Sequence, residues 1–166
     1  MKIEPPYRQK QTSTIHVRAN PDAVFALMCP VREYEWEPGW TTNVILSNSG
    51  LVEEDCVFTT PGGASAGSDK ASPDAIWVTP LHDPNARRLT MIKITPEESV
   101  TRLDIAVDET PAGSSVTTSY EHTALSDAGR ALVDRHTKAR YAEMMAGWRR
   151  AIEGELGAAH TDGARQ

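Results

Sequence analysis

The side chains with the clearest potential for acid–base chemistry lie in residues 30–40, which read PVREYEWEPGW. This stretch places Glu33 close in sequence to Trp36 and Trp40, and it ends at the turn-forming pair Pro38-Gly39. A carboxyl group beside indole rings is partly desolvated, which raises its pKa toward the range useful for general acid–base catalysis. The competing interpretation is a structural carboxylate that caps a helix or pairs with an arginine.

A second candidate for proton transfer, His122, lies in a strand-like run over residues 114–123. Because side chains alternate in direction along a strand, Tyr120 and His122 share one face with Val116 and Thr118. An imidazole that titrates near neutral pH could pass a proton to a carbonyl ligand. The alternative is a hydrogen-bonded histidine that holds the corner between this strand and the helix after it.

The candidate ligand-binding residues are bulky aromatic or sulfur-containing side chains in a chain with only 6% aromatic residues. Aromatic rings suit a planar or aliphatic ligand, and methionines adapt to loosely specific binding of lipid-like molecules. The alternative is that these side chains fill the core, which applies most to Trp148 because it lies on a helical stripe. The set comprises Trp36, Trp40, Phe58, Trp77, Tyr120, Tyr141, Met144, Met145 and Trp148.

The longest helical pattern covers residues 126–156, where apolar residues recur at intervals of three and four. Ser126 is suited to cap the first turn. A helix of this length extends about 45 Å at 1.5 Å per residue, so it can cross a whole sheet. The expected stripe consists of Val133, Thr137, Tyr141, Met144, Met145, Trp148, Ile152 and Leu156.

The rest of the chain reads mainly as short strands. A strand at 12–18 is followed by a short helix that Asn20 caps and Pro21 begins, and then by a second short helix or turn ending at Pro38-Gly39. Turn-forming residues at near-regular intervals predict an antiparallel meander, and residues 61–74 are expected to form a long hairpin loop. The six further strand-like runs are 40–47, 51–60, 75–80, 87–95, 99–107 and 114–123.

This element order predicts an α+β fold in which a curved seven-stranded antiparallel sheet wraps around a long C-terminal helix, with two short helices after the first strand. Residues 12–156 are expected to form one domain, with loose termini at 1–11 and 157–166. A single helix cannot fill the concave side of such a sheet unless bulky side chains plug it. The pattern therefore predicts either a packed hollow or a ligand pocket between sheet and helix.

Composition narrows the classes of function. A net charge of −6 with scattered Lys and Arg argues against a nucleic-acid surface, and no apolar run approaches the ~20 residues of a membrane span. The N-terminus lacks the apolar core of a signal peptide, so a cytoplasmic protein with free Cys29 and Cys56 is expected. The histidines show no metal-ligand spacing, and no nucleotide fingerprint occurs, so neither metal nor cofactor is expected.

Three segments resemble the START/Bet v 1-like superfamily, also called the helix-grip or SRPBCC fold. They are TIHVRANPDAVFALM, PVREYEWEPGW and the run from Tyr120 to Ser126 where the last strand meets the long helix. The resemblance covers roughly residues 12–156 and implies binding of a small hydrophobic or aromatic molecule, as in lipid-transport and polyketide cyclase/dehydrase relatives. Two alternatives stay open: a cyclase or dehydratase that uses Glu33 and His122, and a chaperone-activator-like interaction module. A homodimer is also possible.

Overall fold

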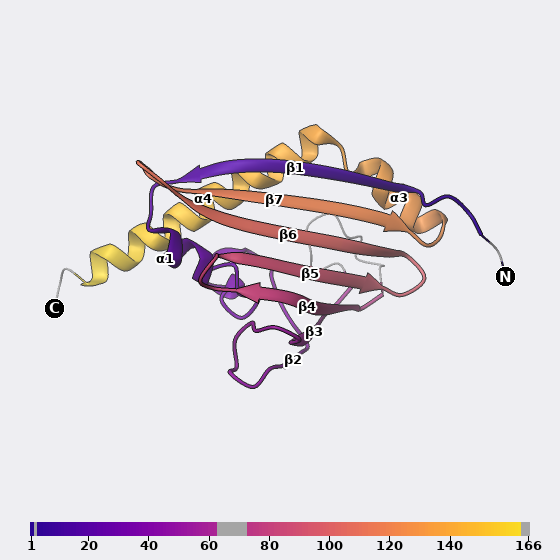
Figure 1. Cartoon of the computed structure of the whole chain (residues 1–166), viewed down its shortest axis with the longest axis horizontal. Coiled ribbons are helices and arrows are strands. Elements are labelled where there is room, and N and C mark those ends of the chain that lie inside the picture. The colour runs from indigo at the N-terminus through magenta and orange to yellow at the C-terminus, as the bar shows by residue number, and fades with distance from the viewer. Residues whose placement is uncertain (2, 63–72, 164–166) are drawn as a thin grey trace.

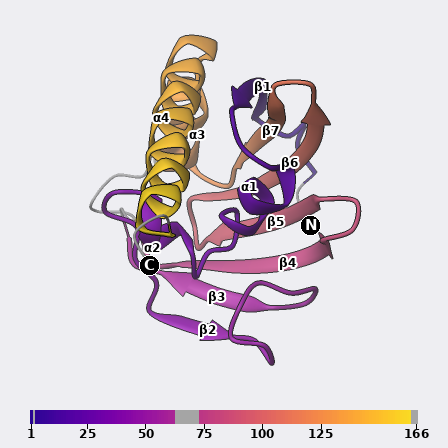
Figure 2. The same ribbon diagram turned by 90° about the vertical axis from the view of Figure 1, so that its left-hand side faces the viewer.

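The computed structural model describes residues 1, 3–62 and 73–163, and within them it has the predicted α+β helix-grip architecture. Seven antiparallel strands form one curved sheet in the order β1-β7-β6-β5-β4-β3-β2. All the helices lie on the concave side, where α4 runs along the hollow (Figures 1 and 2). The strands are β1 (Arg8–Val17), β2 (Val44–Leu46), β3 (Val57–Thr60), β4 (Ala75–Asp83), β5 (Arg88–Thr95), β6 (Ser99–Thr110) and β7 (Gly113–Ala124), and the helices are α1 (Pro21–Ala26), α2 (Glu33–Trp36), α3 (Asp127–Arg135) and α4 (Lys138–Gly163).

The strand boundaries depart from the predicted ones at both edges of the sheet. β1 begins at Arg8, four residues before the expected start, because this polar stretch pairs with β7 through the register Arg8↔Thr123. At the opposite edge, β2 and β3 are much shorter than the runs 40–47 and 51–60. Residues between them form turns, including Asp55 at a φ of 64°. Of the expected loop 61–74, residues 63–72 lie outside the described part of the chain.

The expected continuous helix over 126–156 is wrong in one respect, because the chain breaks at His136 and Thr137 to give α3 and α4. His136 ends α3 with φ −77° and ψ 58°, and the next backbone bond of the new helix runs from Tyr141 N to Thr137 O at 2.9 Å. Ser126 caps α3 as predicted, accepting a hydrogen bond from Gly129 N. α4 then continues past residue 156 to Gly163.

The aliphatic core fills the end of the hollow nearest α1. Val17, Val24, Val107 and Val116 are completely enclosed there, and Ile152 seals them from α4. Asn20 caps α1 as predicted by accepting hydrogen bonds from the amides of Asp22 and Ala23. Burial of such side chains contributes about 1.5–3 kcal/mol each, so this end of the domain is held by ordinary apolar packing. The other end is different, because polar side chains face inward.

The corner between β7 and α3 depends on a glycine. A Cβ at Gly129 would lie 1.9 Å from the carbonyl oxygen of Glu98, an oxygen that also accepts a hydrogen bond from Leu125 N at 2.8 Å. We predict that Gly129→Ala lowers the free energy of unfolding by about 3 kcal/mol, because overpacking displaces this backbone contact.

The matched control is Gly147→Ala, within α4, where a Cβ would meet no atom within 4 Å. Removing a helical glycine there should stabilise the protein by about 0.5–1 kcal/mol. Urea denaturation followed by circular dichroism measures both changes. Equal effects of the two substitutions would contradict the assigned contact.

Candidate ligand-binding site

The concave face of the sheet carries a continuous row of side chains that would suit a ligand. Successive cross-strand pairs join Phe58 to Trp77, Trp77 to Lys93, Lys93 to Thr101 and Thr101 to His122. Directly opposed residues on one face lie about 4.5–5.5 Å apart, so these side chains form one neighbourhood. The sheet therefore aligns these side chains in one row, with aromatic residues at one end and polar residues at the other. The row lies beneath α2 and the α3–α4 break.

His122 is buried in this row and hydrogen-bonded. Its Nδ1 lies 2.6 Å from Thr101 Oγ1, and its ring meets that of His136 edge-on at 4.3 Å between centroids. Burial lowers the His122 pKa to about 3, with smaller contributions from His136 and Lys93. The imidazole is consequently neutral around pH 7 in this environment, and its role in proton transfer stays a prediction. The alternative interpretation, a histidine held by a hydrogen bond, describes its contacts.

His136 is a site residue that the sequence pattern did not reveal, because it lies inside an otherwise regular helical run. The helix break turns its ring inward, where it contacts Tyr120 and Tyr141 as well as His122. Gln11 of β1 holds the break by donating to the His136 carbonyl at 3.1 Å. Burial lowers the pKa of the His136 imidazole, opposed by a hydrogen bond with the Tyr120 backbone.

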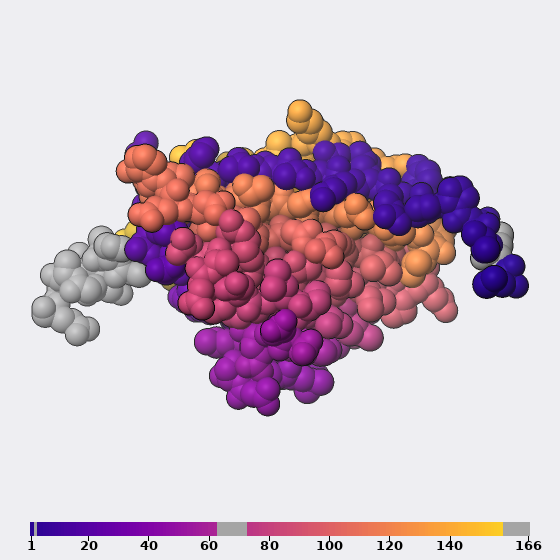
Figure 3. Space-filling model, viewed as in Figure 1, coloured from indigo at the N-terminus to yellow at the C-terminus, as the bar shows by residue number. Residues whose placement is uncertain are grey.

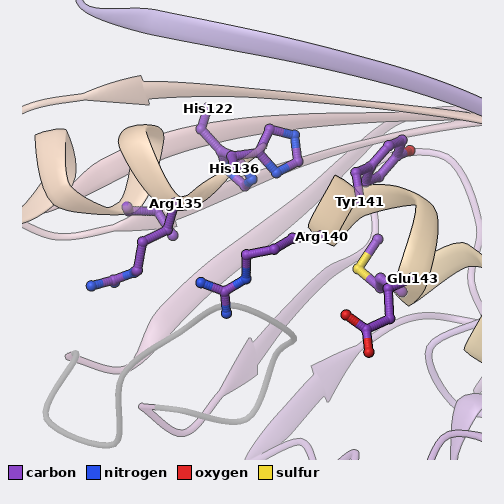
Figure 4. Close-up of a pocket in the computed structure, with 8 residues that line it drawn as sticks. His122, Arg135, His136, Arg140, Tyr141 and Glu143 are labelled. Carbon is purple, nitrogen blue, oxygen red and sulfur yellow. The ribbon is translucent and has the colours of Figure 1, made fainter. Parts of the chain in front are cut away.

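A pocket of about 260 Å³ opens at this break, between the end of β7 and the first turns of α4 (Figure 4). Its walls combine buried histidine and tyrosine rings with a thioether, and Arg135 and Arg140 bring two cationic groups to it. Figure 4 shows both guanidinium groups on the same side of the pocket. The lining residues are His122, Leu132, Arg135, His136, Arg140, Tyr141, Glu143 and Met144.

The predicted stripe residues of the long helix divide between pocket and core. Tyr141 lines the pocket with its ring, while its hydroxyl lies 2.5 Å from Thr118 Oγ1. Burial raises the pKa of Tyr141 to about 12. Met144 is half-buried at the pocket, whereas Met145 is fully enclosed and its sulfur accepts from Thr118. Met145 thus serves the core, and Tyr141 and Met144 shape the pocket.

The four tryptophans form two groups. Trp36 meets Trp148 edge-on at 5.2 Å, which packs α2 against α4. Trp40 contacts both Phe58 and Trp77, which stack at 5.3 Å on β3 and β4. The indole N–H groups of Trp36, Trp40 and Trp77 donate to Leu27 O, Pro30 O and Thr60 Oγ1 at 2.8–3.1 Å. Their polar atoms are therefore occupied, and only ring surfaces remain to face a ligand.

Lys93 is the second site residue that sequence reasoning missed. The alternation along β5 places Lys93 and Met91 on the concave face and the two isoleucines, Ile92 and Ile94, on the outer face. Its ammonium lies 5.5 Å from the centre of the Trp77 ring. Burial lowers the Lys93 pKa to about 8, and the negative charge of Glu98 opposes that shift. In a strand of alternating residues, a lysine usually indicates the solvent-exposed face. The sequence pattern alone therefore does not predict that Lys93 faces the hollow.

Glu33 is 95% buried, as its 5% exposed fraction indicates. The adjacent Arg32 pairs with Glu35 at 2.8 Å, and no hydrogen bond or ion pair reaches the Glu33 carboxyl group among the described residues, so neither a helix cap nor an arginine partner is seen there. Burial, reinforced by Glu37, raises the Glu33 pKa to about 8. The pairing of Glu33 with His122 as a catalytic acid and base stays a prediction.

Comparison with solved structures finds the same fold in several other proteins. Norcoclaurine synthase from Thalictrum flavum aligns over 96% of this chain and 99% of its own at 14% identity, with a TM-score of 0.67. A protein from Rhodobacter sphaeroides aligns over 90% and 93% at 16% identity (TM-score 0.60), and Ara h 8.0201 over 90% and 99% at 13% identity (TM-score 0.59). No protein-family model matches the sequence, and no curated protein matches it either.

The structure also bears on metals, thiols and membranes. Among the described residues there is no cluster of three or more His, Cys, Asp or Glu side chains that could hold a metal ion. Cys29 and Cys56 are buried free thiols. Within the same part of the chain, none of the helices combines the length and apolar character needed to cross a membrane.

The buried Glu33 predicts a pH-dependent cost to stability. Its folded pKa of about 8 lies above the ordinary 4.5, so the folded state binds a proton that the unfolded state releases between these values. The cost is small below pH 4.5, grows as the pH rises, and levels off above about pH 8. Glu33→Gln should therefore raise the free energy of unfolding by roughly 3 kcal/mol more at pH 7.5 than at pH 5.

Urea titrations at the two pH values measure this difference. Glu35→Gln is the control, because Glu35 lies on the same helix but is exposed and paired with Arg32. Its effect should not grow between pH 5 and pH 7.5. A stabilisation by Glu33→Gln that is equal at both pH values would show that Glu33 is already ionised in the folded protein.

Proposed function

We propose that this protein binds one small molecule with an apolar or aromatic body and an acidic group in the hollow beneath the α3–α4 break. The observation that carries this proposal is the pocket of about 260 Å³ in which aromatic rings and a thioether adjoin two arginines. Ligand sites are typically apolar concavities with a few placed polar groups. A volume of about 260 Å³, just below the usual range of ligand pockets, favours a ligand of one or two rings.

The polar groups define where each part of the ligand lies. Arg135 and Arg140 suit a carboxylate or sulfonate, since guanidinium groups match planar and tetrahedral oxyanions. The apolar body would pack against Tyr141 and Met144. His122 and His136 are neutral at pH 7, so they place no charge beside the apolar body of the ligand. A fold relative supports the aromatic class: a norcoclaurine synthase structure contains dopamine and hydroxybenzaldehyde, at 13% identity and a TM-score of 0.64.

Titration with the fluorescent two-ring acid 5-(dimethylamino)naphthalene-1-sulfonate, which carries both features, tests the proposal. We predict saturable one-site binding that 2-naphthoic acid displaces. Met144→Trp should weaken binding at least tenfold by filling the pocket, whereas Ala146→Trp on the exposed side of α4 should not. The readout is probe fluorescence excited away from tryptophan. Non-saturable binding, or equal effects of the two substitutions, would remove the support for this site.

A second candidate function, which we also propose, is self-association through the outer face of the sheet, which none of the described helices covers (Figures 1 and 3). Side chains on β2 to β6, all aliphatic except Thr59, form a two-row patch there, defined by the register Val44–Thr59–Ile76–Ile94–Val100 and Leu46–Val57–Val78–Ile92. Val44, Leu46 and Ile76 are 48%, 63% and 42% exposed. Contiguous apolar patches of this kind mark interaction surfaces.

A second copy of this chain fits the patch better than a charged partner does. The strands beside it carry both signs of charge in compact pairs, Arg102–Asp104 at 2.8 Å and Arg8–Glu121 at 3.3 Å. Such a mixed rim can face its own copy across a two-fold axis without net repulsion. Five strands span roughly 20 Å, a suitable apolar centre for an interface of about 800 Å² per partner.

Sedimentation velocity over a concentration series tests this association. We predict a monomer–dimer equilibrium that Leu46→Glu combined with Ile76→Glu shifts at least tenfold toward monomer. Leu125→Glu is the control, because Leu125 is 56% exposed but lies outside the patch. A wild-type protein that stays monomeric up to several hundred micromolar would contradict self-association and would leave the patch to a different partner.

A further inference from the structure

We infer that the bound molecule extends along α4 from the pocket at the α3–α4 break (the first pocket) into a second pocket beside α2, where its ammonium group pairs with Glu37. This inference rests on the proposed function, because the acidic end of the same ligand lies beside Arg135 and Arg140. It narrows the ligand class to elongated aromatic molecules with an acid at one end and a primary amine at the other.

The second pocket, of about 510 Å³, lies between α4 and the residues that directly follow α2. Met144 lines both this pocket and the first one, so the two adjoin at its side chain. A thioether on an unbranched stem suits such a boundary, because methionine adapts its shape to what packs against it. The residues that line the second pocket are Glu37, Pro38, Met144, Gly147, Trp148, Arg150 and Ala151.

The two pockets follow each other along one face of α4. Positions spaced by four, three and four residues run through both of them, namely Arg140, Met144, Gly147 and Ala151. This spacing places side chains in a single line on a helix. Arg140 and Trp148 are eight residues apart, which corresponds to roughly 12 Å at 1.5 Å per residue. A two-ring body with a short arm can therefore contact both ends of the line.

Gly147 leaves open space at the centre of this line. A Cβ at this position would meet no atom of the described chain within 4 Å. A larger side chain there enters the second pocket rather than the core, and leucine favours a helix more than glycine does. Gly147→Leu therefore fills the second pocket without disturbing the packing beneath α4.

The chemistry of the second pocket suits an ammonium ion. Glu37 is half-buried, and burial raises the pKa of its carboxyl group above the usual value. A cation beside this group favours its ionised form and offsets the loss of solvent. Trp148 brings an aromatic ring to the same pocket, and such rings attract cations. Arg150 also lines the pocket, but it is exposed to solvent, where its charge is screened.

A matched pair of ligands tests the inference. One is 6-(2-aminoethyl)-2-naphthoic acid, and the other is 6-propyl-2-naphthoic acid, which has a methyl group in place of the ammonium group. Isothermal titration calorimetry gives the affinity for each of them and for unextended 2-naphthoic acid. We expect Glu37→Gln to lower the preference for the amine over the propyl compound at least fivefold, because only the amine pairs with the carboxylate. Arg150→Met, which removes a like charge, should raise that preference.

Glu35→Gln is the control for charge, because Glu35 is exposed and its carboxylate pairs with Arg32 at 2.8 Å. It should leave the amine preference unchanged. Gly147→Leu should weaken binding of both extended acids at least tenfold relative to 2-naphthoic acid, because the new side chain occupies the space of the arm. Ala146→Leu is its control, since Ala146 is exposed on α4 and lines neither pocket.

The outcomes separate this inference from the proposed function. If 2-naphthoic acid binds but neither Glu37→Gln nor Gly147→Leu changes these ratios, the second pocket is not used and the first one stands. If Glu143→Gln lowers the amine preference instead, the amine lies in the first pocket and the inference is wrong. If 2-naphthoic acid does not bind the folded wild-type protein, the proposed function and this inference both fail. Circular dichroism melting curves establish that each variant is folded.

Discussion

The structure is governed by a mismatch in width between one helix and seven strands. An α-helix with its side chains is about 10–12 Å across, whereas seven strands at about 4.8 Å spacing span roughly 29 Å. α4 can therefore cover only part of the concave face, and it does so beside β1 and β7 (Figure 2). The remainder must be closed by other means: the aromatic segment around α2, the short helix α1 and the inward-facing side chains of β3 to β5.

Because α4 covers only part of the concave face, one end of the hollow is filled by apolar side chains and the other is lined by polar ones. Near α1, β-branched residues such as Val24 and Val116 interdigitate and leave no accessible surface. Toward the α3–α4 break, Lys93, His122 and Glu33 face inward, and burial shifts each toward its neutral form. A core built only for stability would place apolar residues there, since buried ionisable groups cost free energy. Retaining them is reasonable where this end of the hollow binds a ligand, as proposed above.

The parts of this structure that follow from local pattern were predictable. The alternation over β6 and β7, the Asn20 cap and the Ser126 cap each depend on neighbouring residues alone. The helix break was not predictable from such patterns, because neither glycine nor proline lies at His136 and the break depends on Gln11, 125 positions away. The contact between the His122 and His136 rings likewise exists only in three dimensions. Aromatic bulk was informative but ambiguous, since Trp36 and Trp77 look alike in sequence and have different partners.

The pairing of β1 with β7 has a consequence for how the chain reaches its native state. The ladder from Arg8↔Thr123 to Val17↔Ser114 joins segments about a hundred residues apart. Closing so long a loop is entropically expensive and slows folding relative to local contacts. During synthesis β1 has no partner strand until β7 has been made. Its polar sequence, Arg-Gln-Lys-Gln-Thr-Ser-Thr, favours solubility of the unpaired strand during this interval. Central hairpins β4–β5 and β6–β7 are the segments that can nucleate the sheet first.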